Sequence, residues 1–160
     1  MRFSVASVLL ASLLVGSGTA RAGFTEPTLV LVTAAGAAAE GARSAAFTGL
    51  FEFENALQVG LPIELVVFQG TRFVRYPATG APKTGDSAAL ADGVLSDNEL
   101  AAFRQEGTAA PAGVRIITLA PDRIRVALPA TFTAGPTTAV LFTILDDGGV
   151  LSNALGFTLP

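Results

Sequence analysis

The sequence predicts an all-β domain in which two sheets pack as a sandwich. Several short segments alternate apolar and polar residues with a period of two, and Gly, Pro or Asp residues separate them. Apolar residues make up 51% of the 160-residue chain and charged residues only 14%, which supports a hydrophobic core and differs from a disordered composition. The same pattern is also compatible with a closed β-barrel, which is the alternative.

The N-terminus predicts a cleavable export signal over residues 1–22. Arg2 supplies the positive charge, residues 5–15 form a short apolar segment, and Ala20-Arg21-Ala22 fits an A-x-A cleavage site. The apolar segment is too short and too interrupted by serine to span a bilayer, and a buried core helix is the alternative. We expect residues 23–160 to form one periplasmic or extracellular domain with no membrane span.

Four strands are expected in the first half of this domain. Residues 28–33 form the first, and residues 47–54 the second, where phenylalanines alternate with Thr and Glu. The third contains Ile63, Leu65 and Val67, and the fourth covers residues 71–76. Gln69-Gly70 separates the third and fourth strands as in a tight hairpin.

Four more strands are expected in the second half, which brings the total to about eight. They cover residues 114–119, 123–128, 138–145 and 150–159. Asp147-Gly148 lies between the last two and supplies the positive φ of a hairpin turn. In the last strand one face is expected to carry Leu151, Leu155, Phe157 and Leu159.

Two segments interrupt the strand pattern. Residues 34–46 are rich in Ala and Gly, which indicates a long loop or a turn of helix. Residues 77–112 form an insertion in which Ser96 and Glu99 have the spacing of a capping box, so a helix is expected to follow and to end before Gly107. Because long structureless loops are unusual in compact domains, this insertion is the candidate functional segment.

The C-terminal third, residues 113–160, resembles the immunoglobulin-like IPT/TIG module. The segments that carry the resemblance are RVALP at 125–129, Gly135, AVLFTI at 139–144, DDGG at 146–149 and SNALGFT at 152–158. The resemblance implies an immunoglobulin-like β-sandwich that serves as a spacer or binding unit in an exported protein. The N-terminal half aligns less well, which leaves open a sandwich of different topology with a convergent final hairpin.

The composition excludes several chemistries. The chain has no His, Cys or Trp, so it lacks the usual neutral-pH base, the commonest zinc ligands, thiol catalysis and disulfides. Once Arg2 and Arg21 are removed, 8 basic and 13 acidic residues remain, a net charge of −5. The negative net charge argues against nucleic acid and anionic membrane surfaces as partners.

A calcium site is one hypothesis for residues 86–99. With Glu99 at the bidentate position of an EF-hand loop, Asp92 and Gly93 take positions five and six. The candidate metal ligands are therefore Asp92, Asp97 and Glu99, with Asp86 nearby. The first half of such a loop lacks ligands, since it would place Ala88 and Leu90 at ligand positions. The competing interpretation is a turn followed by a capped helix, with no cofactor.

Catalytic interpretations rest on few side chains. Glu52 and Glu54 would lie about 7 Å apart on one strand face, a spacing that suits glycoside hydrolysis and equally a solvated strand. Lys83, the only lysine, could form a Ser-Lys pair or simply be solvated. Arg72, with Arg75 and Tyr76, could form an exposed anion-binding patch, or could pair with a Glu across the sheet. We predict no catalytic residue.

The leading prediction is therefore an exported, non-catalytic structural or protein-interaction module whose partner is a protein or a cell-surface component. A calcium-dependent ligand-binding module that uses residues 86–99 is the alternative. A secreted hydrolase that depends on carboxylates is the third candidate.

Overall fold

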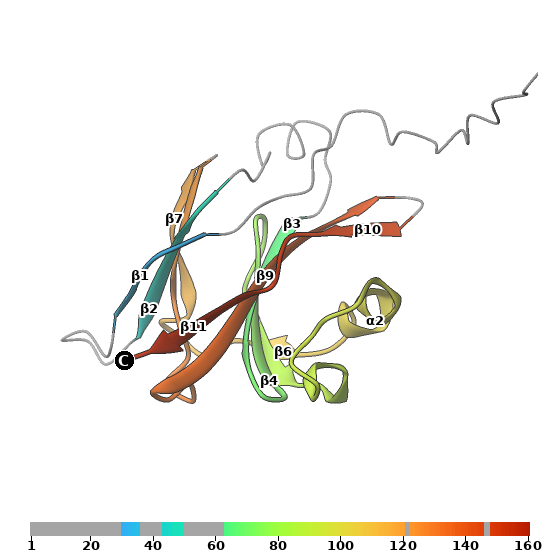
Figure 1. Ribbon diagram of the computed structural model, residues 1–160, viewed down its shortest axis with the longest axis horizontal. Coiled ribbons are helices and arrows are strands. Elements are labelled where there is room, and N and C mark those ends of the chain that lie inside the picture. The colour runs from blue at the N-terminus through green and yellow to red at the C-terminus, as the bar shows by residue number, and fades with distance from the viewer. Residues whose placement is uncertain (1–29, 36–42, 50–62, 121, 146–147) are drawn as a thin grey trace, which may run out of the picture.

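The computed structural model describes residues 30–35, 43–49, 63–120, 122–145 and 148–160 (Figure 1). The predicted export signal, residues 36–42 of the Ala/Gly-rich segment, and Glu52 and Glu54 lie outside the described residues. The described ranges contain one 3-10 helix, one α-helix and eleven strands, with these bounds: β1 Val30–Ala35, β2 Ser44–Thr48, β3 Ile63–Gln69, β4 Arg72–Pro77, β5 Lys83–Asp86, η1 Ala88–Leu90, α2 Asp97–Phe103, β6 Thr108–Ala109, β7 Arg115–Ala120, β8 Arg123–Ala127, β9 Gly135–Leu145, β10 Gly148–Leu151 and β11 Leu155–Leu159.

The strands form two antiparallel sheets, which confirms the predicted all-β sandwich. The four-stranded sheet has the order β1-β2-β8-β7. The seven-stranded sheet has the order β10-β9-β3-β4-β5-β6, and β11 also pairs with β9. Because β11 also contacts β1, the C-terminal strand lies where the two sheets approach each other (Figure 1).

The main core lies between the two sheets. Its buried side chains are Ala45, Phe47, Ile63, Leu65, Val67, Val74, Tyr76, Val114, Ile124, Val126, Leu128, Phe132, Ala139, Leu141 and Leu159. Burial of each large aliphatic or aromatic side chain stabilises the fold by about 1.5–3 kcal/mol. Tyr76 adds a polar link, because its hydroxyl on β4 donates to the carbonyl oxygen of Ala127 on β8 at 2.7 Å.

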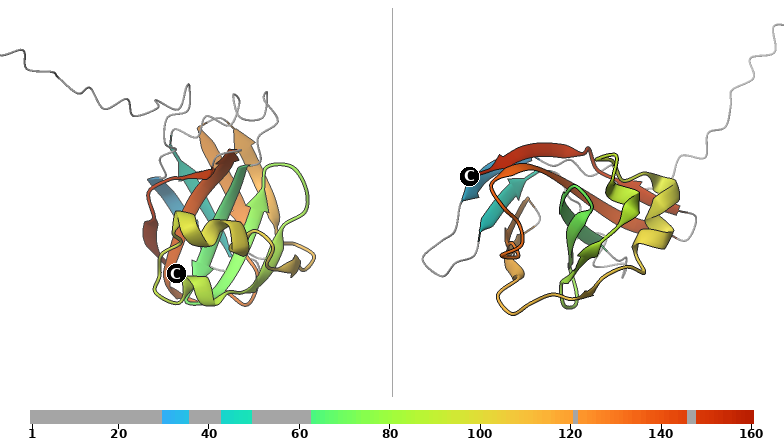
Figure 2. Two further views of the ribbon diagram at one scale, coloured as in Figure 1. Left: turned by 90° about the vertical axis from the view of Figure 1, so that its right-hand side faces the viewer. Right: turned by 90° about the horizontal axis from the view of Figure 1, so that it is seen from below.

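A second core covers the outer face of the seven-stranded sheet. The sheet contributes Val66, Phe68, Phe73, Val140 and Phe142, and the insertion contributes Leu90, Leu95, Leu100 and Phe103. Figure 2 shows α2 on the side of this sheet away from the four-stranded sheet. The molecule therefore has three layers, and β3 is buried on both faces, which explains its nearly continuous apolar sequence.

The insertion is thus largely part of the fold. The predicted helix is confirmed as α2, and the chain leaves it before Gly107, whose φ is 95°. The pattern missed β5 and β6 because their sequences, KTGD and TA, lack apolar alternation. Both strands extend the seven-stranded sheet beside Phe73. The Phe73 ring packs so closely on Gly85 that a Cβ atom added to this glycine would lie only 3.0–3.1 Å from the ring.

The final hairpin corrects one prediction. The expected single strand 150–159 is divided into β10 and β11, and both pair with β9. Leu151 pairs with Phe142 but Leu155 pairs with Ala139, so this arm holds one extra residue relative to β9. An extra residue reverses the faces on which side chains lie. Leu151 consequently packs against the outer core, whereas Leu155, Phe157 and Leu159 face the main core.

Ser152 holds this bulge in place. Its backbone N–H donates to the carbonyl oxygen of Leu141 at 2.8 Å, and its Oγ accepts a hydrogen bond from the backbone N–H of Leu141 at 2.8 Å. The irregular arm therefore stays hydrogen-bonded to β9. In the described part of the chain, no helix is long and apolar enough to cross a membrane.

Candidate functional site

The predicted calcium ligands make local hydrogen bonds. An Asp92 Oδ1 atom accepts from the N–H of Val94 at 3.0 Å. Glu99 Oε2 accepts from the backbone N–H of Ser96 at 3.1 Å, as in a capping box, and also from the Ser96 hydroxyl at 2.6 Å. The Asp97 side chain lies outside what the structure describes. Among the described residues, no group of three or more acidic side chains is placed to share a metal ion.

The capped-helix interpretation accounts for the positions of Asp92 and Glu99. Asp86 is also engaged, because its Oδ1 accepts from the Thr71 hydroxyl at 3.3 Å on the neighbouring hairpin. The calcium hypothesis stays a prediction to be tested in solution.

Arg72, Arg75 and Tyr76 on the β3–β4 hairpin do not form an exposed anion-binding patch, one of the two interpretations of the sequence. Arg72 is exposed and donates to the carbonyl oxygen of Thr131 at 2.7 Å, while the strand carboxylates Glu52 and Glu54 lie outside the described residues. Tyr76 and Arg75 are buried on opposite faces of β4, one in each core layer. Lys83 is exposed at the start of β5. These four side chains therefore do not form a common site.

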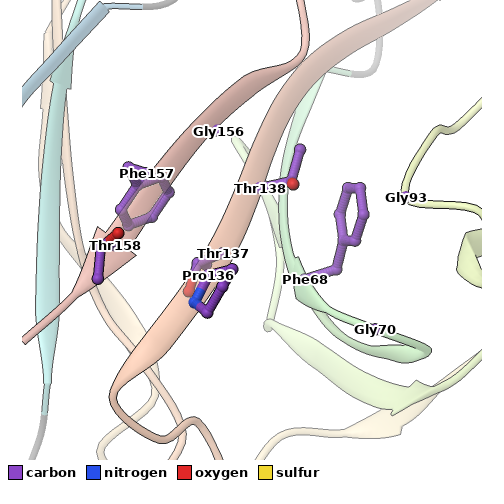
Figure 3. A pocket seen from close by; sticks show the side chains of 9 residues that line it. All are labelled: Phe68, Gly70, Gly93, Pro136, Thr137, Thr138, Gly156, Phe157 and Thr158. Carbon is purple, nitrogen blue, oxygen red and sulfur yellow. The ribbon is translucent and has the colours of Figure 1, made fainter.

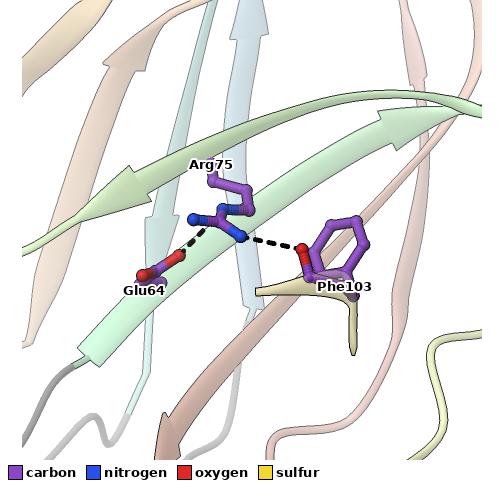
Figure 4. A network of polar contacts seen from close by, with 3 residues as sticks. All are labelled: Glu64, Arg75 and Phe103. Atoms are coloured by element: carbon purple, nitrogen blue, oxygen red, sulfur yellow. Dashed lines mark hydrogen bonds and ion pairs between the residues drawn. The ribbon is translucent and has the colours of Figure 1, made fainter. Parts of the chain in front are cut away.

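A buried ion pair lies between β3 and β4, and its arginine also contacts the insertion (Figure 4). Arg75 Nε lies 3.1 Å from Glu64 Oε2, and the two side chains are only 4% and 11% exposed. Arg75 Nη1 donates to the carbonyl oxygen of Phe103, the last residue of α2, at 2.9 Å. The guanidinium carbon also lies 5.6 Å from the centre of the Phe103 ring. Arg75 thus attaches the C-terminal end of α2 to β4.

Burial lowers the pKa of Arg75, and the neighbouring Glu64 carboxylate opposes that shift. Burial raises the pKa of Tyr76 well above its usual value. Both groups make structural contacts, since one holds α2 and the other links the two sheets. The sequence offered one signal for the ion pair, because Glu64 interrupts the otherwise apolar run of β3 and a charge buried there needs a partner.

A groove of about 400 Å³ lies on the part of the seven-stranded sheet that the insertion leaves open (Figure 3). We call it the glycine groove, and its lining residues are Phe68, Gly70, Gly93, Pro136, Thr137, Thr138, Gly156, Phe157 and Thr158. Phe68, Thr138 and Gly156 are direct cross-strand neighbours on β3, β9 and β11. No lining residue is ionisable, so the groove offers apolar, backbone and hydroxyl groups.

Gly156 is the residue that keeps the groove open. A Cβ atom at this position would meet no other atom within 4 Å, and the backbone there does not need the left-handed region. A larger side chain at Gly156 would therefore project into the groove without strain. Nothing in the sequence predicted this site, because it depends on how far the insertion extends over the sheet.

A second hollow of about 420 Å³, the edge cleft, lies between the two sheets. One wall is the connection from β4 to β5 and the other is β7, and the lining residues are Pro77, Ala78, Gly80, Pro82, Arg115, Ile116, Ile117 and Leu119. The side chains of Ile117 and Leu119 are 41% and 38% exposed. This cleft exposes apolar side chains at the open edge of the sandwich.

No protein-family model matches the sequence, and no curated protein matches it significantly. Among solved structures, the chain is similar to the chitinase ChiW from Paenibacillus sp. str. FPU-7, a bacterial cell-surface-expressed multi-modular enzyme. The TM-score is 0.38 and the sequence identity 12%, over 89% of this chain. The chain corresponds to 9% of the length of that chitinase.

Proposed function

We propose that the protein is an exported, non-catalytic β-sandwich module that binds a protein or another component of the cell surface. The observation that carries this proposal is the glycine groove. Its floor is a row of cross-strand neighbours, and its walls offer threonine hydroxyls, backbone groups and aromatic carbon without any ionisable group. Such a surface suits recognition by shape and hydrogen bonding, and it lacks an acid, base or nucleophile of the usual kinds.

Two features of the sequence support the rest of the proposal. The segment at residues 1–22 has the arrangement of an export signal. The resemblance of residues 113–160 to the IPT/TIG module fits a spacer or binding role. Of the five segments that carry that resemblance, SNALGFT at 152–158 contains Gly156, which lines the groove.

Binding to isolated envelopes of the producing cells tests the proposal. The full chain is compared with the Gly156→Leu variant, which fills the groove, and with Asn98→Leu, a matched control on the exposed surface of α2. We expect the first variant to bind about tenfold more weakly or worse, the effect of a substitution at an interface centre. Equal binding by the two variants, or no binding by the unmodified chain, would contradict the proposal.

The hydrolase alternative has its own test. The unmodified chain is assayed on esters, peptides and glycans, with Glu52→Gln and Glu54→Gln as matched variants. We expect no turnover above the background of a heat-inactivated sample. Turnover that either variant abolishes while the melting temperature is retained would replace the binding proposal with an enzymatic one.

A further inference from the structure

The edge cleft lies along a strand with an unpaired edge. In the four-stranded sheet β7 is the last strand, and within the described residues it pairs only with β8. The strand at the other end, β1, is instead flanked by β11. An unpaired strand edge presents a row of N–H and C=O groups to which a further strand can bind.

Apart from Arg115, the side chains of β7 that line the cleft are apolar, and two of them are exposed. Leu119 pairs with buried Ile124, yet it is 38% exposed. A bulge between Ile116 and Thr118 inserts Ile117, which is 41% exposed and also lines the cleft. Of the three large apolar side chains that are exposed in the described residues, two lie here. The inner face of β7 therefore lacks the cover that the other core strands have.

Several backbone groups of the opposite wall of the cleft are already unavailable for hydrogen bonding. Pro77 and Pro82 have no N–H group, the N–H of Ala78 donates to Ile63 at 2.8 Å, and the carbonyl of Pro82 accepts from Ala110 at 3.0 Å. An occupant would therefore pair its backbone with β7 and place side chains against the prolines. An extended polypeptide meets both requirements, because its side chains alternate between two faces.

Charge indicates the composition of that polypeptide. The four strands of the smaller sheet contain Arg115, Arg123 and Arg125 and no acidic residue. All three arginines are exposed, and Arg115 lines the cleft. A strand added to β7 would lie next to Arg115 and one strand away from Arg123 and Arg125 on β8, so acidic side chains on it would complement their charge.

A second copy of this chain fits less well. Antiparallel pairing of β7 with its own copy would join two arginine-bearing sheets into one, with six arginines and no counter-charge from their strands. Like charges brought together across an interface are costly. We propose that the edge cleft binds an extended, acidic segment of another polypeptide, which adds a strand to β7. This inference rests on the proposed binding role but uses a surface separate from the glycine groove.

Selection of displayed peptides provides the test. Random peptides of about ten residues, the length of a long strand, are selected on the full chain and counter-selected on the Ile117→Glu variant. We expect the enriched peptides to carry Asp or Glu together with alternating apolar residues, and to weaken as salt is raised. No enrichment, or enrichment of basic peptides, would overturn the proposal.

Variants of the protein then locate the binding site. One selected peptide should bind Ile117→Glu and Arg125→Glu about tenfold more weakly or worse, and should bind Val94→Glu as it binds the unmodified chain. Val94 is 52% exposed in the insertion, so it is a matched control for Ile117. Circular dichroism establishes that each variant is folded, and Leu119→Glu replaces Ile117→Glu if that variant is not.

Amide hydrogen exchange separates strand addition from other binding modes. The peptide should slow exchange of β7 amides, and an N-methylated peptide that cannot donate to β7 should not bind. Unchanged exchange in β7, or a dimer that Ile117→Glu dissociates, would overturn the inference. Peptide binding by Gly156→Leu should equal that of the unmodified chain, so the two proposals can fail independently.

Discussion

At the scale of single residues, the buried ionisable groups stabilise the fold through specific partners. Tyr76 is the only tyrosine and the chain has no Trp, so tyrosine absorbance in the near ultraviolet reports on this one side chain. Glu64 and Arg75 lie in a core layer that sequence alternation did not reveal. Sequence alternation identified the buried face correctly where the other face of the strand is exposed to solvent, as in β8. It failed in β3 and β4, where the insertion covers the second face of the sheet.

The buried hydroxyl of Tyr76 makes stability sensitive to alkaline pH. Its pKa is raised on folding, so the folded state holds this proton more tightly than the unfolded state does. The stabilisation is complete below the unfolded pKa of about 10 and falls by about 1.4 kcal/mol per pH unit above it. Tyrosinate absorbance should therefore rise together with unfolding in one alkaline transition.

Tyr76→Phe is the matched variant for this prediction. It should lose about 0.5–1.5 kcal/mol at neutral pH with the hydrogen bond to Ala127, and its stability should fall less steeply in alkali. Tyrosinate absorbance that rises near pH 10 in a chain still folded by circular dichroism would contradict the burial of this hydroxyl.

The prediction about calcium also belongs to the scale of single residues. Since Asp92 and Glu99 accept hydrogen bonds from their own turn and helix cap, we expect no dependence on calcium. The melting temperature of the unmodified chain in calcium should equal that in chelator. A rise of several degrees in calcium that Glu99→Gln abolishes would restore the metal site.

At the scale of elements, α2 is held to the sheet by apolar contacts and by one hydrogen bond from Arg75. Phe103 packs edge-to-face on Phe73 with 4.8 Å between ring centres, and Arg75 contacts the Phe103 carbonyl. The capping box predicted α2 because caps are local in sequence. It could not predict η1, β5 or β6, whose places depend on contacts with β4 and Phe73.

Removal of Arg75 should both leave Glu64 without its partner and remove a hydrogen bond to α2. Arg75→Met leaves the Glu64 carboxylate buried without a partner and should reduce the free energy of unfolding by about 3–5 kcal/mol. Arg72→Met, on the same strand but exposed, should cost no more than about 1 kcal/mol. Denaturant unfolding measures both.

The double variant Glu64→Leu/Arg75→Met provides the control. Because it removes both charges, it should recover most of the stability that Arg75→Met loses. An Arg75→Met variant as stable as Arg72→Met would show that the contacts of Arg75 with Glu64 and α2 do not stabilise the fold. A double variant less stable than Arg75→Met would show that the Glu64 charge is not what destabilises the single variant.

At the scale of the whole molecule, the two sheets and the insertion form three layers that leave two hollows open. The all-β class, the insertion and its helix could be predicted because they follow from local patterns. The glycine groove and the edge cleft could not, since each forms where distant strands end or stay uncovered. The bulge at Ser152 could not be predicted either, because it arises from pairing with β9. This bulge moves Leu151 to the outer core.

The central claim is that this chain works by binding, through the surface that Gly156 keeps open. Photo-crosslinking in the producing cells tests it most directly, with a photoreactive amino acid in place of Gly156 and, as the control, in place of Asn98. We predict a discrete crosslinked product with an envelope component from the Gly156 position only. Identical products from both positions, or none from Gly156 in a chain that is exported and folded, would contradict the account.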